Sequence, residues 1–203
     1  MNTLWKSYVT LILLMNTAQA YTPERGHIHA IFGSYFYKTD SPEGHFLGFQ
    51  AGSPSLTILG DLSSKGSLEI SLGFLNKRYI VEQGDLSIIA ESPVVLAGFG
   101  YRHWINKRAS FSGLLYSSYP TRGAHVRSNT FPERKTTTAD KNTENGIELR
   151  AQYEVLGNDV WGITVEGRYA YALTRESNEY LDQYGVFIGL RHLIQESKTP
   201  RPL

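Results

Sequence analysis

Hydrophobic and polar side chains alternate along much of this chain with a period of two residues. In "GITVEGRYAY" (162–171), Ile163 and Val165 occupy one register, while Glu166 and Arg168 occupy the other. This alternation predicts a β-strand with one apolar and one charged face. The strand alone does not say which face is buried, because a soluble sandwich buries the apolar face and a membrane barrel turns it outward.

The same alternation recurs and predicts an all-β protein. The eight expected strands cover residues 26–37, 55–62, 67–76, 94–104, 109–119, 145–155, 160–171 and 184–194. The second strand has an alternative start at His45, with Pro54 as a bulge or a break in the ladder. An independent strand over 45–51 would raise the count to nine, and we prefer eight.

The connections between these strands alternate strictly between long and short segments. Three are short polar turns (63–66, 106–108 and 156–159), and four are long (38–54, 77–93, 120–144 and 172–183). In an up-and-down antiparallel barrel every second connection lies on the same rim, so the short turns share one rim and the long loops the other. The sequence therefore predicts an eight-stranded antiparallel up-and-down transmembrane β-barrel.

The charged positions of the strands share the inward register if the apolar register faces outward. Four acidic and four basic residues fall there: Asp61, Glu69, Glu148 and Glu166, with Arg102, Arg150, Arg168 and Arg191. The interior of a barrel of about eight strands holds only side chains, so these charges are expected to form hydrogen-bonded pairs. The alternative is a set of ordinary ion pairs on the surface of a soluble sheet.

Aromatic residues gather near the predicted strand ends. We expect two girdles at the heights of the two membrane interfaces, formed by Tyr37, Tyr79, Tyr119, Tyr171 and Tyr184 beside the long loops and by Trp104, Phe111 and Trp161 beside the short turns. Trp104 falls on the inward register of its strand, with Arg102, and so does not fit a position that faces lipid.

The first twenty residues, "MNTLWKSYVTLILLMNTAQA", have the pattern of a secretory signal peptide. Lys6 precedes a short apolar run, and Ala18-Gln19-Ala20 supplies the small residues of a cleavage site. Cleavage near Ala20 would leave a barrel domain over 21–194 and a polar tail over 195–203. The alternative is a retained anchor helix, for which the apolar run is short.

Composition adds that the chain has no cysteine, 19 glycines and 13 tyrosines. Without disulfides, a large core or a closed hydrogen-bonded sheet must stabilise the fold. A net charge of +1 and a pI near 7.9 give no reason to expect nucleic acid as a partner.

Three C-terminal segments, "GIELRAQYEV", "GITVEGRYAY" and "GVFIGLRH", together with "VVLAGFGYRHW", give the chain a resemblance to the small eight-stranded outer-membrane barrels of the OmpA-like superfamily. The resemblance implies a location in the bacterial outer membrane, contact with its lipid and lipopolysaccharide, and insertion by the barrel-assembly machinery. One departure is the polar tail "QESKTPRPL", where such barrels usually end on an aromatic residue.

Candidate chemistry is sparse. His27 and His29 lie on one face of the first strand and are a possible metal pair, but we expect neither a metal nor a cofactor, and no serine adjoins His103 or His192 in a catalytic motif. We therefore expect a non-enzymatic barrel with an occluded interior, which serves envelope structure or surface interaction through its loops. Alternatives are a lipid-modifying barrel enzyme, a narrow pore, or a secreted soluble barrel that binds an apolar ligand. The sequence names no external ligand.

Overall fold

The computed structural model describes residues 21–40, 49–132, 143–175 and 178–195. They form strands and no helix: β1 (Ile28–Thr39), β2 (Gln50–Ser63), β3 (Gly66–Gln83), β4 (Leu86–Trp104), β5 (Ala109–Pro120), β6 (His125–Asn129), β7 (Glu144–Gly157), β8 (Trp161–Ala172), β9 (Glu179–Tyr180) and β10 (Gln183–Gln195). No helix in these residues is long and apolar enough to cross a membrane. The predicted signal segment 1–20 and all of the predicted tail except Gln195 lie outside the described residues.

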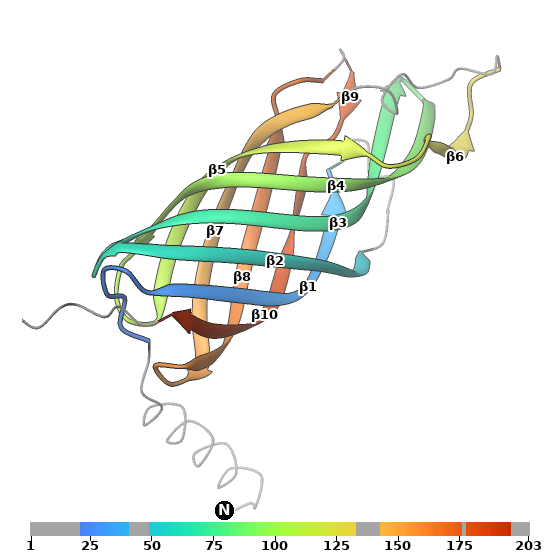
Figure 1. Ribbon diagram of the computed structural model, residues 1–203. Helices are drawn as coiled ribbons and strands as arrows, with labels where there is room; N and C mark the ends of the chain where they lie inside the picture. The colour runs from blue at the N-terminus through green and yellow to red at the C-terminus, as the bar shows by residue number, and fades with distance from the viewer. Residues whose placement is uncertain (1–20, 41–48, 133–142, 176–177, 196–203) are drawn as a thin grey trace, which may run out of the picture.

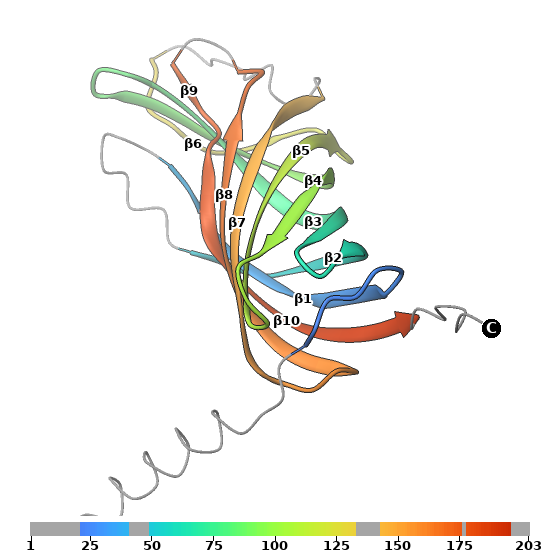
Figure 2. The ribbon, with the colours of Figure 1, turned by 90° about the vertical axis from the view of Figure 1, so that its left-hand side faces the viewer.

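Eight of the strands close into an antiparallel barrel in the order β4-β5-β7-β8-β10-β1-β2-β3, and the pairing of β3 with β4 completes the circle. The short strands β6 and β9 add to β4 and β3 beyond one end of the barrel (Figure 1 and Figure 2). The predicted eight-stranded up-and-down barrel is confirmed.

The connections are sorted between the two ends as expected. The β2–β3, β4–β5 and β7–β8 turns lie at one end, which we call the short-turn rim, together with the segment that enters β1 (Figure 1). The other end, which we call the long-loop rim, holds the ends of β1, β5 and β8, the starts of β2, β7 and β10, and the tip of the β3–β4 hairpin.

The expectation of a long loop over 77–93 is wrong. β3 and β4 stay paired from Gly66↔His103 to Gln83↔Leu86, and only Gly84 and Asp85 form the turn. Gly84 has a φ of 58°, a left-handed conformation that glycine adopts without strain. A Gly-Asp pair between two runs with β-branched residues, "YIV" (79–81) and "SII" (87–89), is a hairpin signal. β-propensity thus extends the hairpin beyond the rest of the barrel.

β2 begins at Gln50, earlier than expected, and contains Pro54. Its ladder with β3 ends at Ser55↔Gly73, so Pro54 pairs only with Ser34 of β1. A proline is tolerated there because no second neighbour requires its missing N–H. The described part of 45–51 belongs to β2, and no ninth barrel strand forms within the described residues.

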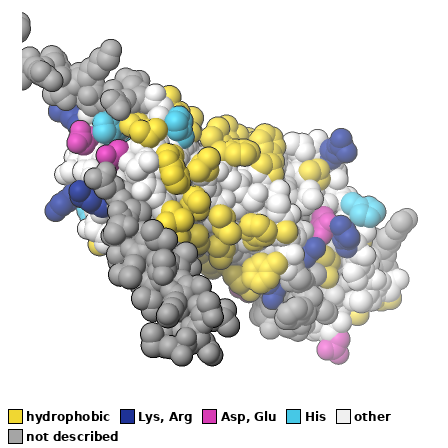
Figure 3. Space-filling model, turned by 90° about the horizontal axis from the view of Figure 1, so that it is seen from below, with side chains coloured by type: hydrophobic (Ala, Val, Ile, Leu, Met, Phe, Trp, Pro, Cys, Tyr) yellow, Lys and Arg dark blue, Asp and Glu magenta, His cyan; other side chains and the backbone are white. Residues whose placement is uncertain are grey.

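The outer and inner faces of the wall differ in chemistry. The outward register carries exposed apolar side chains on every barrel strand, for example Leu115 (67 % exposed) and Leu149 (57 %). Figure 3 shows such side chains gathered across the middle of one face, with charged groups toward both ends. The inward register is rich in buried serine, glutamate and arginine, with Ile31, Leu114 and Phe187 among them.

Five of the expected girdle aromatics lie on the outside of the wall: Phe111, Tyr119, Trp161, Tyr171 and Tyr184. The expectation is wrong for the other three, which are buried. Tyr37 projects inward, and its hydroxyl donates to the Asn76 carbonyl (2.7 Å) on the β3 edge that β2 leaves free. Trp104 also projects inward and donates to Ser67 Oγ (2.9 Å). Tyr79 of the extended hairpin packs against Ala172 of β8 and Leu181, which follows β9.

Two glycines on adjacent strands offer a test of this wall. A Cβ on Gly185 would lie 2.0 Å from the Phe36 carbonyl oxygen, whereas a Cβ on Gly167 would meet nothing within 4 Å. We expect Gly185→Ala to lower the urea midpoint of unfolding in detergent, by the equivalent of about 1–3 kcal/mol, because the backbone must shift. Gly167→Ala is the matched control and should unfold like the unaltered protein; equal midpoints for both variants would contradict the close approach of β10 and β1.

Candidate functional site: the charged lumen and its rims

All eight of the charged side chains expected in the interior are buried in the lumen. Six of them form one cluster, which we call the central network: Glu69 of β3, Arg102 of β4, Glu148 and Arg150 of β7, and Glu166 and Arg168 of β8. Each occupies the inward register of its strand. Because side chains alternate between the two faces of a strand, all six project from these four strands into the lumen.

Arg102 is the most connected member of the central network. Its Nε and Nη2 donate to the two carboxylate oxygens of Glu69 (2.9 and 3.0 Å). Nη2 also donates to Glu166 (2.7 Å), and Nη1 donates to Gln152 (2.6 Å) and Ser110 (3.1 Å). The guanidinium thus uses its planar set of donors to join β4 to four other strands of the barrel, β3, β5, β7 and β8.

Arg150 and Arg168 face each other directly across β7 and β8. Two like charges in that position repel, and the acidic side chains offset the repulsion. Arg150 donates to Glu69 (2.7 Å) and Glu148 (2.6 Å), and Arg168 donates to Glu166 (2.7 Å). Arg168 also lies over the Phe187 ring, with its Cζ atom 4.0 Å from the ring centre, a cation–π contact.

Arg191 and Asp61 do not join the central network. Arg191 pairs with Glu154 on the short-turn rim (2.8 Å) and donates to the carbonyls of Asn158 (2.6 Å) and Asp159 (3.3 Å). The charged residues predicted from the sequence to face the lumen did not include Glu154, although Glu154 continues the register of Glu148, Arg150 and Gln152. That register was the available signal.

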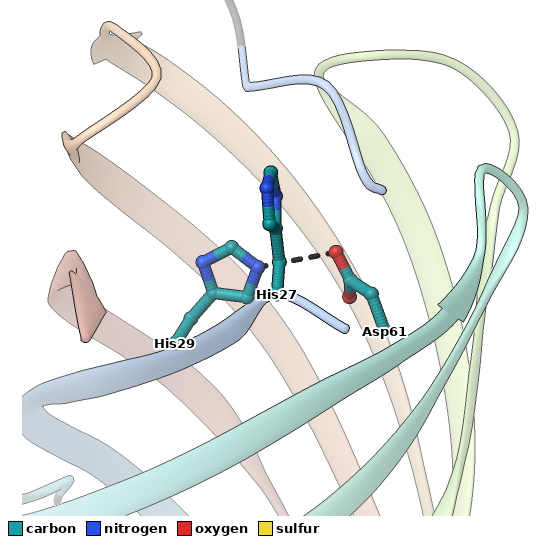
Figure 4. Close-up of side chains that lie close together, drawn as sticks. All are labelled: His27, His29 and Asp61. Carbon is teal, nitrogen blue, oxygen red and sulfur yellow. Dashed lines mark hydrogen bonds and ion pairs between the residues drawn. The ribbon is translucent and has the colours of Figure 1, made fainter. Parts of the chain in front are cut away.

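Asp61 lies in a second group on the short-turn rim. With His27 and His29 it forms what we call the rim cluster (Figure 4). His29 Nε2 lies 3.2 Å from Asp61 Oδ2, Ser67 Oγ donates to Oδ1 (2.6 Å), and the Tyr21 hydroxyl donates to Oδ2. The sequence placed His27 and His29 on one face but did not bring Asp61 to them.

Tyr21 closes the lumen at this rim. Its ring is 1 % exposed, lies beneath Arg191 (4.5 Å from Cζ) and contacts His29 edge-on. Burial, followed by the hydrogen bond to Asp61, raises the pKa of the Tyr21 hydroxyl far above its usual range, so the group remains a donor. No periodic signal marked Tyr21, because it precedes the first strand.

Two ion-pair groups lie toward the long-loop rim. Lys77 pairs with Glu144, which also accepts a hydrogen bond from the Tyr116 hydroxyl (2.8 Å). Farther out on the hairpin, Glu91 accepts from Arg78 (2.6 Å) and from Arg127 of β6 (2.8 Å). Burial raises the pKa of Glu91, but the two arginines outweigh burial and hold the pKa below its usual range, so Glu91 is ionised near neutral pH.

The central network crosses the lumen from wall to wall. Above the central network there is a cavity of about 20 Å³, lined in part by Tyr35, Arg168 and Gln183, which is room for about one water molecule. Ser67 donates to Asp61, and no hydrogen bond joins a serine to a histidine in the part of the chain that the structure describes. Within the described residues, charged side chains thus bridge the lumen, and no serine is positioned for activation by a histidine.

Comparison with known proteins identifies the fold. No protein-family model and no curated protein matches the chain. Among solved structures, the outer membrane protein OprG from Pseudomonas aeruginosa matches 88 % of this chain and 100 % of its own, with a TM-score of 0.51 and 10 % identity. Ail, the attachment invasion locus protein of Yersinia pestis, in complex with the heparin analogue sucrose octasulfate, matches 82 % of this chain and 99 % of its own, with a TM-score of 0.50 and 14 % identity. The chain has the fold of the small outer-membrane barrels.

The central network predicts a large effect of removing one partner. Arg102→Met should lower the free energy of unfolding by about 3–5 kcal/mol, because Glu69 and Glu166 would remain buried with fewer counter-charges. Urea unfolding in detergent measures this, with Lys65→Met in the exposed β2–β3 turn as the control.

The double variant Glu69→Gln/Arg102→Met should lose less stability than the sum of the two single variants, because the two residues share one interaction. Strict additivity would contradict a coupled network.

Proposed function

We propose that this chain, with the fold of the small outer-membrane barrels, spans the bacterial outer membrane as a non-enzymatic protein with an occluded lumen. The observation that carries the proposal is the apolar belt outside a wall whose inner face holds the buried charges. A protein in water does the reverse, since an apolar surface that surrounds the whole molecule would cause association. A closed barrel satisfies its backbone hydrogen bonds internally, as the bilayer requires.

The orientation follows from the two rims. In bacterial barrels the short turns face the periplasm and the longer loops face the outside. We therefore infer that the entry of the chain and Tyr21 face the periplasm. Cleavage after Ala20 would make Tyr21 the first residue, and its backbone nitrogen lies 3.4 Å from Glu154 Oε1, where a free amino group would meet a carboxylate. The barrel-assembly machinery would insert such a chain.

The long-loop rim supports a role in surface interaction. The extended β3–β4 hairpin carries β6. Glu91 of β4 pairs with Arg127 of β6 and so attaches it, and the same carboxylate pairs with Arg78 of β3 within the hairpin. Arg127 is 62 % exposed in its side chain, and Arg122 and His125 are also exposed. Guanidinium groups exposed at the long-loop rim would bind the phosphates of lipopolysaccharide through charge-assisted hydrogen bonds.

The lumen disfavours the two membrane-bound alternatives. A pore requires a continuous water path, but the central network joins opposite walls through hydrogen bonds of 2.6–3.1 Å around Arg102. A lipid-modifying enzyme requires a nucleophile and base in contact at one rim, and Ser67 and His29 both bind Asp61 instead.

Cell fractionation with gel mobility tests the proposal. We expect the protein in the outer-membrane fraction, and we expect an unheated sample to migrate differently from a boiled one, because the closed hydrogen-bonded barrel resists detergent until heated. A soluble periplasmic protein whose mobility does not change on heating would overturn the proposal and favour a secreted barrel that binds an apolar ligand.

A further inference from the structure

The rim cluster gathers metal-binding atoms from three positions of the backbone. One ring nitrogen each from His27 and His29 and one carboxylate oxygen of Asp61 lie within 4.8 Å of one another (Figure 4). The β1–β2 ladder fixes this proximity, because Ile28 is opposite Gly60 and the Asp61 N–H donates to the His27 carbonyl (2.9 Å).

Asp61 differs from the other lumen carboxylates in its counter-charge. Glu69, Glu148 and Glu166 pair with arginines of the central network, Glu154 pairs with Arg191, and Glu144 pairs with Lys77. Asp61 is equally buried, but among the described residues its ion-pair partner is His29 alone. Within the described residues, no salt bridge joins Asp61 to a lysine or an arginine, so a bound cation would supply the counter-charge that this buried carboxylate lacks.

The surroundings of Asp61 orient it as a ligand. Ser67 Oγ (2.6 Å), the Tyr21 hydroxyl and the Glu24 N–H (3.2 Å) all donate to its carboxylate. In metal sites, hydrogen-bond partners of this kind lie outside the coordination shell and hold the ligating side chain in its orientation. His29 and Asp61 have no exposed side-chain surface, while His27 is 13 % exposed, so an ion can enter from the His27 side.

We propose that His27, His29 and Asp61 bind one divalent transition-metal ion of the zinc class at the short-turn rim. Two imidazoles and one carboxylate, with a fourth position left to water, form a common tetrahedral zinc set. Ligand distances of about 2.0–2.1 Å place the ligand atoms roughly 3.3 Å apart. The pair of His29 Nε2 and Asp61 Oδ2 is at 3.2 Å. The partly exposed His27 ring must move closer and exchange its contact with the Tyr21 hydroxyl, 3.2 Å from Nδ1, for the ion.

The ion would attach the entering segment to the barrel wall. His27 precedes β1, and Asp61 lies near the end of β2, so coordination links the chain after Tyr21 to the first hairpin. Arg191 lies over the Tyr21 ring beside the site, and its positive charge would oppose binding of a cation. The ion pair between Arg191 Nε and Glu154 Oε2 (2.8 Å) offsets that charge. The site does not depend on the function proposed above, because it lies away from the long-loop rim.

Titration of the purified protein tests the site. The protein is prepared in detergent without a polyhistidine tag, treated with a chelator, and titrated with Zn²⁺ by calorimetry. We expect one Zn²⁺ per chain, and at least tenfold weaker binding for His27→Gln and Asp61→Asn. His192→Gln is the control, since His192 is exposed on β10 near the same rim, and it should bind like the unaltered protein.

Thermal unfolding supplies a second readout. Zn²⁺ should raise the midpoint of the unaltered protein and of His192→Gln but not of His27→Gln, because a ligand stabilises the state that binds it. His27 is the partly exposed member, so its variant remains informative if the Asp61 variant fails to fold. No binding of Zn²⁺, or equal binding by His27→Gln and the unaltered protein, would overturn the proposal.

Discussion

The lumen of an eight-stranded barrel has room for side chains only. A charged side chain inside it must therefore pair with an opposite charge from another lumen residue, because an unpaired buried charge is costly. This constraint governs the structure. Arg102 bridges Glu69 and Glu166 from neighbouring and distant strands, and Arg150 and Arg168 tolerate their direct opposition because carboxylates lie beside them. A slip of one residue in any of these strands would turn its charges outward into the apolar belt. The network therefore selects one register.

The same constraint links the lumen to the outer surface. Because side chains alternate along a strand, charges confined to the lumen leave the outward register free for apolar residues such as Leu115 and Leu149. The outer wall then presents an apolar surface that suits lipid. Polar groups that could bind other molecules are exposed at the two rims. At one rim an extended hairpin carries exposed arginine, and at the other Tyr21 and the rim cluster close the lumen.

Period-two alternation predicted most of the fold, because a two-faced wall imposes it on the sequence directly. It placed Glu166, Arg168 and their partners on one face, although it could not show that Arg191 pairs with Glu154. Aromatic position was a poorer guide: Tyr37 and Trp104 share the inward register, where their polar groups reach Asn76 and Ser67. The closure by Tyr21 and the meeting of His27 and His29 with Asp61 depend on strand pairing, which no local pattern reveals.

Conductance in a planar bilayer tests the occluded lumen most directly. If the central network fills the barrel, the reconstituted protein will show no steady single-channel current in either polarity. Steady and reproducible single-channel steps from the folded protein would require a continuous water path past Arg102 and Arg150, and would contradict the account.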